Sequence, residues 1–177
     1  MPRTSTVEAT ALLKSQHRKV EAIFKKLEGG RAEPQPLLEE LKRDLSAHMR
    51  IEQDIFYPAV RQVDEDLVLE SFEEHSLAEI ALRRLLATPG DDPTFIAKVT
   101  TLKELIQHHV EEEESDLFPK VEKKLGKEKN QELGSAMKSK FDELTDGAPV
   151  ALSKGNRTTA DMAERRVLRQ MAAGNTG

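Results

Sequence analysis

Four of the five histidines in the sequence lie on the predicted inner faces of helices, and each is followed, four residues later, by a glutamate. The pairs are His17 with Glu21, His48 with Glu52, His75 with Glu79, and His109 with Glu113. Residues four apart lie on one face of an α-helix, so both side chains of a pair can reach one point. Imidazole nitrogens and carboxylate oxygens are ligands that iron, manganese and zinc accept. The spacing therefore predicts a metal site built from these eight side chains.

The segments that carry the pairs are predicted to bury them. Apolar residues precede each pair at alternating spacings of three and four, as Leu41 and Leu45 precede His48, which is typical of the inner stripe of an amphipathic helix. A buried, unpaired carboxylate costs at least several kcal/mol, and these stripes carry no Lys or Arg. Divalent cations would neutralise the carboxylates. The alternative, pairs on a solvated surface, would remove central core positions from two helices.

Four long helices are predicted, with approximate ranges 5–29, 37–57, 66–86 and 94–125. Gly and Pro clusters separate them, and Pro58 predicts a kink or a stop near Tyr57. Short connections favour antiparallel neighbours. The predicted fold class is therefore all-α, an up-down-up-down antiparallel four-helix bundle.

A short fifth helix is predicted over 130–144, which completes a bundle domain of residues 1–144. Residues 145–177 are rich in small and polar residues and carry five Lys and Arg against three Asp and Glu. This composition predicts a flexible tail, with a short basic helix over 160–171 as the alternative. The tail is the candidate contact for a protein partner.

Composition limits the kind of site and of partner. Cys is absent, which excludes a thiolate nucleophile and a Cys-ligated metal. The net charge of -5 and the lack of a basic patch predict no nucleic-acid partner. No apolar run suits a membrane span or a secretory signal, so we expect a cytoplasmic protein with no membrane partner. A phosphotransfer bundle needs one exposed His, and four inward pairs argue against it.

The sequence also repeats itself. The segments HMRIEQDIFYP (48–58) and HVEEEESDLFP (109–119) share the His, Glu and Pro positions, and His17 corresponds to His75 in the same way. Such a pseudo-twofold repeat predicts two half-sites and hence a dinuclear centre. Ferritin-like bundles use Glu-x-x-His, which this sequence lacks. The order of the motifs resembles the hemerythrin-like family, especially the bacterial HHE cation-binding domains, over roughly residues 6 to 144.

This resemblance implies two iron ions (Fe2+/Fe3+) with an oxo or hydroxo bridge, ahead of manganese or zinc. The implied terminal ligands are His17, His48, His75 and His109, and the implied bridges are Glu52 and Glu113. Oxygen carriers of the family place the second bridging carboxylate at the position of Glu114, but the internal repeat favours Glu113. His108 lies about 100° around the helix from His109 and is interpreted as a rim residue.

Glu79 stands where oxygen-carrying hemerythrins have a further His. Two octahedral ions offer about twelve positions, of which the His, the bridging Glu and an oxygen bridge fill about ten. Glu79 as a ligand leaves one position for dioxygen, peroxide or nitric oxide. Glu21 is expected to orient a histidine or to act as an occasional ligand.

We therefore expect a non-haem di-iron protein that binds or reacts with a small oxidant, with oxidation, peroxide handling or sensing ahead of oxygen carriage. A modest peroxide-consuming or oxidase activity stays open, although the sequence shows no nucleophile with a dedicated base. The alternative is a non-redox metal- or iron-sensing interaction module in which the metal orders the bundle.

Overall fold

The computed structural model describes residues 7–30, 33–147, 151–152 and 157–174, and every element within these ranges is helical. The elements are α1 (Ala9–Gly29), α2 (Pro34–Ile51), the π-helical turn η1 (Glu52–Phe56), α3 (Tyr57–Val60), α4 (Glu65–Leu86), α5 (Phe95–Glu112), the π-helical turn η2 (Glu113–Leu117), α6 (Phe118–Asp146) and α7 (Thr159–Gly174). The expected start of the first helix at residue 5 lies outside the described residues. None of the described helices is long and apolar enough to cross a membrane.

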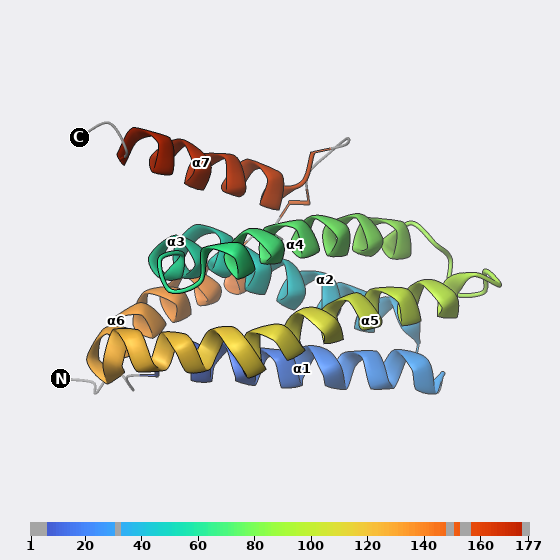
Figure 1. The fold of residues 1–177 in the computed structure, drawn as a ribbon. Coiled ribbons are helices and arrows are strands. Elements are labelled where there is room, and N and C mark those ends of the chain that lie inside the picture. The colour runs from blue at the N-terminus through green and yellow to red at the C-terminus, as the bar shows by residue number, and fades with distance from the viewer. Residues whose placement is uncertain (1–6, 31–32, 148–150, 153–156, 175–177) are drawn as a thin grey trace.

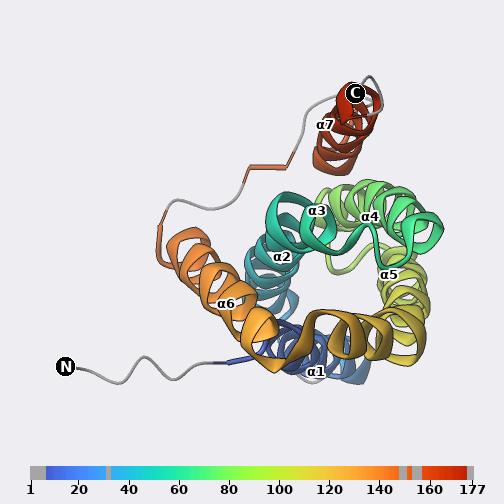
Figure 2. The ribbon, with the colours of Figure 1, turned by 60° about the vertical axis from the view of Figure 1, so that its left-hand side comes forward.

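The helices α1, α2, α4 and α5 form the bundle. Each contacts its neighbours in the order α1, α2, α4, α5 and back to α1, and Figure 2 shows this ring nearly end on. Successive helices run in opposite directions, with short connections at the ends (Figure 1). The predicted up-down-up-down antiparallel bundle is therefore confirmed.

Two π-helical turns interrupt the long helices at corresponding places. η1 begins at Glu52 and η2 begins at Glu113, and the amide that follows each turn donates to the carbonyl of that glutamate. Each turn comes shortly before a proline. The wider turn moves the preceding carbonyls and so relieves the clash that a proline ring causes inside an α-helix. Of the two predicted outcomes near Tyr57, a kink or a stop, the stop does not occur, because the helix continues through the π-helical turn as α3 to Val60.

The bundle interior is apolar at both ends and polar in the middle. One apolar cluster includes Val20 and Leu82, and a second includes Leu13 and Phe72. The positions of the predicted His and Glu pairs fall between these two clusters along the helices. Each fully buried Leu or Phe contributes about 1.5–3 kcal/mol, so the apolar clusters hold the four helices in register around the polar layer.

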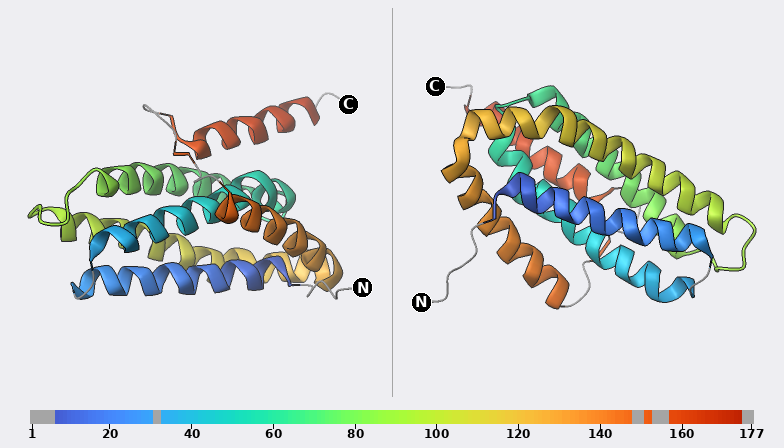
Figure 3. Two further views of the ribbon diagram at one scale, coloured as in Figure 1. Left: turned by 180° about the vertical axis from the view of Figure 1, so that it is seen from behind. Right: turned by 90° about the horizontal axis from the view of Figure 1, so that it is seen from below.

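Helix α6 starts in the bundle and leaves it at Gly126. Gly126 has φ 72° and ψ 170°, which is outside the helical region, so the helix changes direction there (Figure 3). The sequence predicted this break and a separate helix over 130–144. The second part crosses α1 and α2, where a Cβ on Gly134 would lie 2.1 Å from the Val7 carbonyl oxygen.

Helix α7 lies along the outside of α4 (Figures 1 and 2). The structure thus has the basic helix rather than a flexible tail over residues 159–174, while residues 148–150, 153–156 and 175–177 of the expected tail lie outside the described part. The small residues that made this segment look flexible include one helical stripe, Ala160, Ala163 and Val167, which is buried against the bundle. Asp161 accepts from the Thr158 amide and closes the first turn.

Glu79 holds the start of α7. Its buried Oε2 accepts from the Thr159 backbone N–H and from the Thr159 hydroxyl, both at 2.8 Å. We predict that Glu79→Ala loosens α7, because loss of such a capping acceptor costs about 1–2 kcal/mol. Hydrogen exchange of the α7 amides measures the change.

Thr159→Val is the matched variant, since it removes one of the two bonds and keeps the other. Its exchange rates should fall between those of the wild type and Glu79→Ala. Equal protection of α7 in all three proteins would contradict this role for Glu79.

Candidate metal centre

Six of the eight side chains that the sequence singled out converge in the polar layer. They are His17, His48, Glu52, His75, His109 and Glu113, and each is at most 4% exposed. The histidines come one each from α1, α2, α4 and α5, and the two glutamates open the π-helical turns. The polar layer is therefore built from all four bundle helices.

The four histidines form two halves, His17 with His48 and His75 with His109, and both halves share the two carboxylates. Glu52 Oε2 lies 3.2 Å from His48 Nε2 and 3.3 Å from His75 Nε2. Glu113 Oε2 lies 3.4 Å from His17 Nε2 and 3.6 Å from His109 Nε2. Each carboxylate thus faces one histidine from either half, as a bridging ligand between two ions would.

Two overlapping groups in the layer have the spacing of a metal site. One consists of His17, His48 and Glu52, and the other of Glu52, His75 and His109. The ligand atoms within each group lie within 4.8 Å of one another. The geometry thus offers two neighbouring positions for a cation.

Several atoms of this layer have no hydrogen-bond partner among the described residues. They are His17 Nε2, both carboxylate oxygens of Glu52, and Glu113 Oε2. The separations of 3.2–3.6 Å around them are long for hydrogen bonds. An ion with bonds of about 2.0–2.2 Å holds its ligand atoms about 2.8–3.6 Å apart. The residues present therefore fit divalent cations.

Two of the histidines donate a hydrogen bond from the outer ring nitrogen, Nδ1, to a carboxylate. His17 Nδ1 donates to Glu114 Oε1 at 2.8 Å, and His109 Nδ1 donates to Glu74 Oε2 at 2.7 Å. A proton held on Nδ1 leaves Nε2 bare and directed at the centre, which is the tautomer that binds a metal. Glu114 thus supports a histidine, and the choice of Glu113 over Glu114 for the inner position agrees with the geometry.

The other two histidines have amide partners. His48 Nδ1 donates to Gln16 Oε1 at 2.8 Å. The amide of Gln53 lies 3.2 Å from His75 Nδ1, and its Oε1 has no partner among the described residues. Turning this amide over lets His75 Nδ1 donate to Gln53 Oε1, which satisfies the oxygen and leaves Nε2 bare. The sequence analysis missed all four outer partners, because they come from other helices.

Burial sets the charges of the layer. Burial raises the pKa of Glu52 well above its usual range, and repulsion from Glu113 adds to this shift. Burial would raise the pKa of Glu113 too, but the charges of His109 and His17 and the hydrogen bond from Tyr57 outweigh it and lower that pKa. The surroundings thus favour the protonated form of Glu52 and the ionised form of Glu113, and a divalent cation bound between them would displace a proton from Glu52.

The histidines also differ from one another in the direction of their pKa shifts. Burial, with repulsion from the other imidazoles, lowers the pKa of His48 and of His75 well below the usual value. Burial also acts to lower the pKa of His109, but Glu113 and Glu74 outweigh it and raise that pKa. At neutral pH His48 and His75 are neutral, as metal ligands must be.

Tyr57 is a residue of the centre that the sequence analysis missed. Its hydroxyl donates to Glu113 Oε1 at 3.0 Å and lies 3.2 Å from His75 Nε2 and 3.4 Å from His109 Nε2. Burial, with the charges of Glu113 and Glu52, raises the pKa of Tyr57 well above its usual value. A π-helical turn separates Glu52 from Tyr57, so the 3.6-residue periodicity of an α-helix does not place these two side chains on one face.

The phenol makes the two halves of the centre different. In the second repeat the position of Tyr57 is taken by Phe118, which stacks beside His17 with the ring centroids 6.0 Å apart. Tyr57 lies beside His75 with the ring centroids 5.4 Å apart. One half of the centre therefore contains a phenol oxygen and the other a phenyl ring.

Two of the eight expected ligands lie elsewhere. Glu21 is on the outer side of α1, where Lys25 at 3.0 Å and Arg18 at 3.4 Å pair with it, and the hydrogen bond from Lys25 leads the effects that lower its pKa. Glu79 is fully buried but turned toward Thr159. Both keep the four-residue spacing from a histidine, yet neither belongs to the two metal-type groups of the polar layer.

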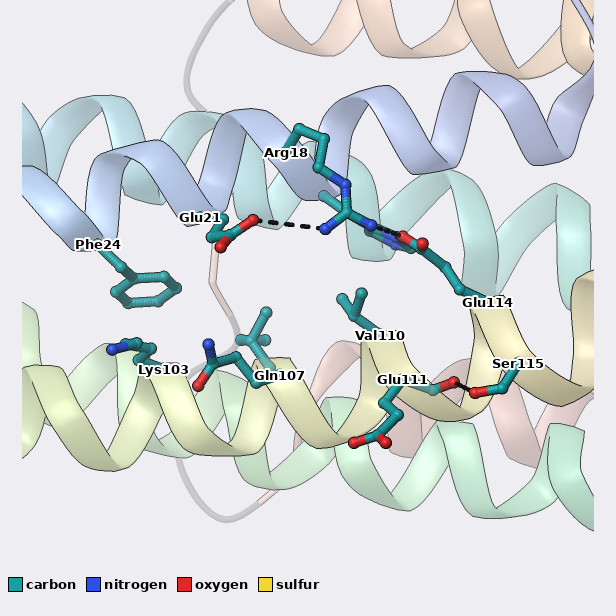
Figure 4. A pocket seen from close by; sticks show the side chains of 11 residues that line it. Arg18, Glu21, Phe24, Lys103, Gln107, Val110, Glu111, Glu114 and Ser115 are labelled. Carbon is teal, nitrogen blue, oxygen red and sulfur yellow. Dashed lines mark hydrogen bonds and ion pairs between the residues drawn. The ribbon is translucent and has the colours of Figure 1, made fainter.

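A groove reaches the centre from the surface between α1 and α5. It has a volume of about 520 Å³, and Figure 4 shows Arg18 spanning its rim between Glu21 and Glu114. A small inner cavity of about 10 Å³ touches all four histidines. Ile106 and Val110 line both spaces, as does His17. These three side chains form the wall between the groove and the inner cavity.

Several known proteins are similar to this chain. A DNA nickase from Nostoc sp. is 29% identical over 132 residues, which is 72% of this chain and 37% of that protein. The chain thus spans about a third of that relative. An uncharacterized protein of Mycobacterium tuberculosis (strain H37Rv) is 27% identical over 115 residues, which is 64% of this chain and 70% of the relative.

A solved structure and a family model agree. The crystal structure of a hemerythrin HHE cation binding domain-containing protein from Mycobacterium kansasii matches with a TM-score of 0.72 and 28% identity, over 91% of this chain and 99% of that chain. The model of the Hemerythrin HHE cation binding domain matches residues 8–121, which include all six side chains of the buried layer. This chain belongs to the hemerythrin HHE cation-binding domain family.

Proposed function

We propose that the buried layer binds two iron ions and that the protein binds or reacts with a small oxidant such as dioxygen, peroxide or nitric oxide. The observation that carries the proposal is the set of buried, unpartnered ligand atoms on His17, Glu52 and Glu113. One position lies between His17 and His48 and the other between His75 and His109, with the two carboxylates shared. Iron bound there supplies one-electron changes and coordination positions for a small oxidant.

The side chains have distinct tasks in this proposal. The imidazole Nε2 atoms bind the ions, while the Nδ1 partners Glu114, Glu74, Gln16 and Gln53 hold the rings in orientation. Glu52 and Glu113 neutralise the ions, and the apolar clusters on both sides exclude water. A small molecule in the groove has to pass only the wall of His17, Ile106 and Val110 to reach the inner cavity that touches all four histidines.

Tyr57 gives the half at His75 and His109 a further oxygen. Its distances to the two Nε2 atoms are those of a neighbouring ligand, and its hydrogen bond to Glu113 holds the phenol in place. We propose that Tyr57, as a phenolate, would be a further residue to hold iron in this half. The half at His17 and His48, with Phe118 beside it, then keeps more room for an external molecule.

A second candidate is a metal-sensing interaction module. The observation that favours it is Glu79, which lies one turn from His75 on α4 and holds the start of α7. A shift of α4 on metal binding would then reach α7, the candidate contact for a protein partner. A metal-loaded protein whose spectrum does not change with peroxide or nitric oxide would favour this candidate.

Glu52→Gln should remove most of the metal. It keeps the size of the side chain but loses the negative charge that faces both halves. Metal affinity should fall by more than the roughly 10–100-fold that follows loss of an outer partner of a ligand. Metal analysis of the purified proteins gives the ratio of iron to chain.

Glu21→Gln and Glu79→Gln are the controls, because they remove the same charge from glutamates with the same spacing to a histidine. Both should keep about two ions per chain. A wild type that stays free of iron after expression in iron-rich medium would contradict the proposed function.

Removal of the metal should destabilise the fold. A ligand present at 1,000 times its dissociation constant stabilises the folded state by about 4 kcal/mol. Chelation should therefore lower the Tm by several degrees in the wild type, and by much less in Glu52→Gln. Thermal unfolding with and without chelator measures both, and an unchanged Tm in the wild type would argue against a buried site.

Tyr57→Phe should keep both ions but change the colour of the ferric protein. A phenolate bound to Fe3+ gives a visible charge-transfer absorption, and Tyr57 is the only tyrosine in the sequence. The absorption should be present in the wild type and lost in the variant. A wild type without it would restrict Tyr57 to its hydrogen bond with Glu113.

A further inference from the structure

A second group of ligand-type side chains lies outside the buried centre, on the outer face of α4 and α5. Glu74, His108 and Glu112 bring one ligand atom each within 4.8 Å of the others. His108 is the most open of the three, with 64% of its side chain exposed, against 15% for Glu74 and 27% for Glu112. The group is accessible to ions in solution.

The distances between the ligand atoms of this group suit a bound ion better than direct hydrogen bonds between the side chains. His108 Nε2 lies 3.5 Å from Glu74 Oε1 and 3.5 Å from Glu112 Oε1. This is the long limit of a hydrogen bond, but it is close to the separation of two ligand atoms on an ion with bonds of about 2.0–2.2 Å at roughly tetrahedral angles. Three protein ligands would leave the remaining positions to water.

The group is negatively charged, and its glutamates have no permanent cation as a partner among the described residues. Glu70 lies near enough to add its charge to those of Glu74 and Glu112. In the part of the chain that the structure describes, Glu74 and Glu112 form ion pairs with histidines but with no Lys or Arg. Glu112 Oε2 also has no hydrogen-bond partner among these residues. A divalent cation would balance this charge.

The other histidine with a carboxylate partner, His17, has a permanent cation beside that carboxylate. His17 donates to Glu114, and Glu114 pairs with Arg18, a permanent cation of the chain. His109 donates to Glu74 in the same way, but the residue beyond Glu74 is His108. Where one half of the centre has a built-in cation, the other half has a ligand that can hold an exchangeable one.

Glu74 joins the outer group to the buried centre. One of its oxygens faces His108, and the other accepts from Nδ1 of His109, whose Nε2 faces the polar layer. We propose that Glu74, His108 and Glu112 form a third, exposed divalent-cation site that captures Fe2+ for the buried centre. The proposal rests on the proposed function, because it assigns the source of the buried iron.

The third site can be tested apart from the buried centre. The centre is first filled with Zn2+, and Mn2+ is then added while the ring protons of the histidines are followed by NMR. Bound Mn2+ should broaden the His108 signals first. Glu112→Gln should abolish this effect, while Glu111→Gln, which removes the same charge one residue away, should retain it.

The capture role is tested by the rate of loading. With Fe2+ limiting, His108→Ala and Glu112→Gln should load the buried centre severalfold more slowly than the wild type and Glu111→Gln, and all four should reach the same final iron content. Absorbance after rapid mixing gives the rate, and metal analysis gives the content.

Selective broadening at His108 together with slower loading in both variants supports the proposal. Absence of the broadening overturns it, and so does loading at the wild-type rate in His108→Ala. A buried centre that takes up no iron in any of the four proteins is a different result, because it contradicts the proposed function and leaves the Mn2+ experiment at His108 readable.

Discussion

Two buried carboxylates that cannot both stay charged without a cation are the constraint on which this structure depends. Glu52 and Glu113 lie in a layer that four helices close off from water. A buried ionised group costs several kcal/mol unless it is paired. Two of the imidazoles around the carboxylates supply ligands but no positive charge, because burial keeps His48 and His75 neutral. The apolar clusters on both sides supply the stability with which the fold tolerates this layer.

The outer partners of the histidines show that the layer is organised beyond its six side chains. Carboxylates support His17 and His109, which face Glu113, and amides support His48 and His75, which face Glu52. A carboxylate partner makes an imidazole a stronger donor to a metal than an amide does. Each of the two proposed ions would therefore have one more basic and one less basic imidazole.

The sequence predicted the bundle and its polar layer, because apolar periodicity and the repeated His and Glu spacing both act along single helices. It could not distinguish Glu52 and Glu113 from Glu21 and Glu79, since all four have the same spacing to a histidine. Which of them point inward depends on the partners that each one meets. Lys25 and Arg18 of the same helix, α1, pair with Glu21 on its outer side, and Thr159 at the start of α7 engages Glu79. Tyr57 was missed because a π-helical turn breaks the 3.6-residue period.

The two π-helical turns also determine which side chains after them face the centre. A π turn holds one residue more than an α turn, so each behaves as a single-residue insertion in an otherwise regular helix. If the same residues adopted α-helical geometry without this turn, all that follows would be rotated by about 100°. The phenol would then leave the centre and the apolar residues of α3 would leave the core. The π-helical geometry of this turn thus constrains the centre as much as the identity of a ligand does.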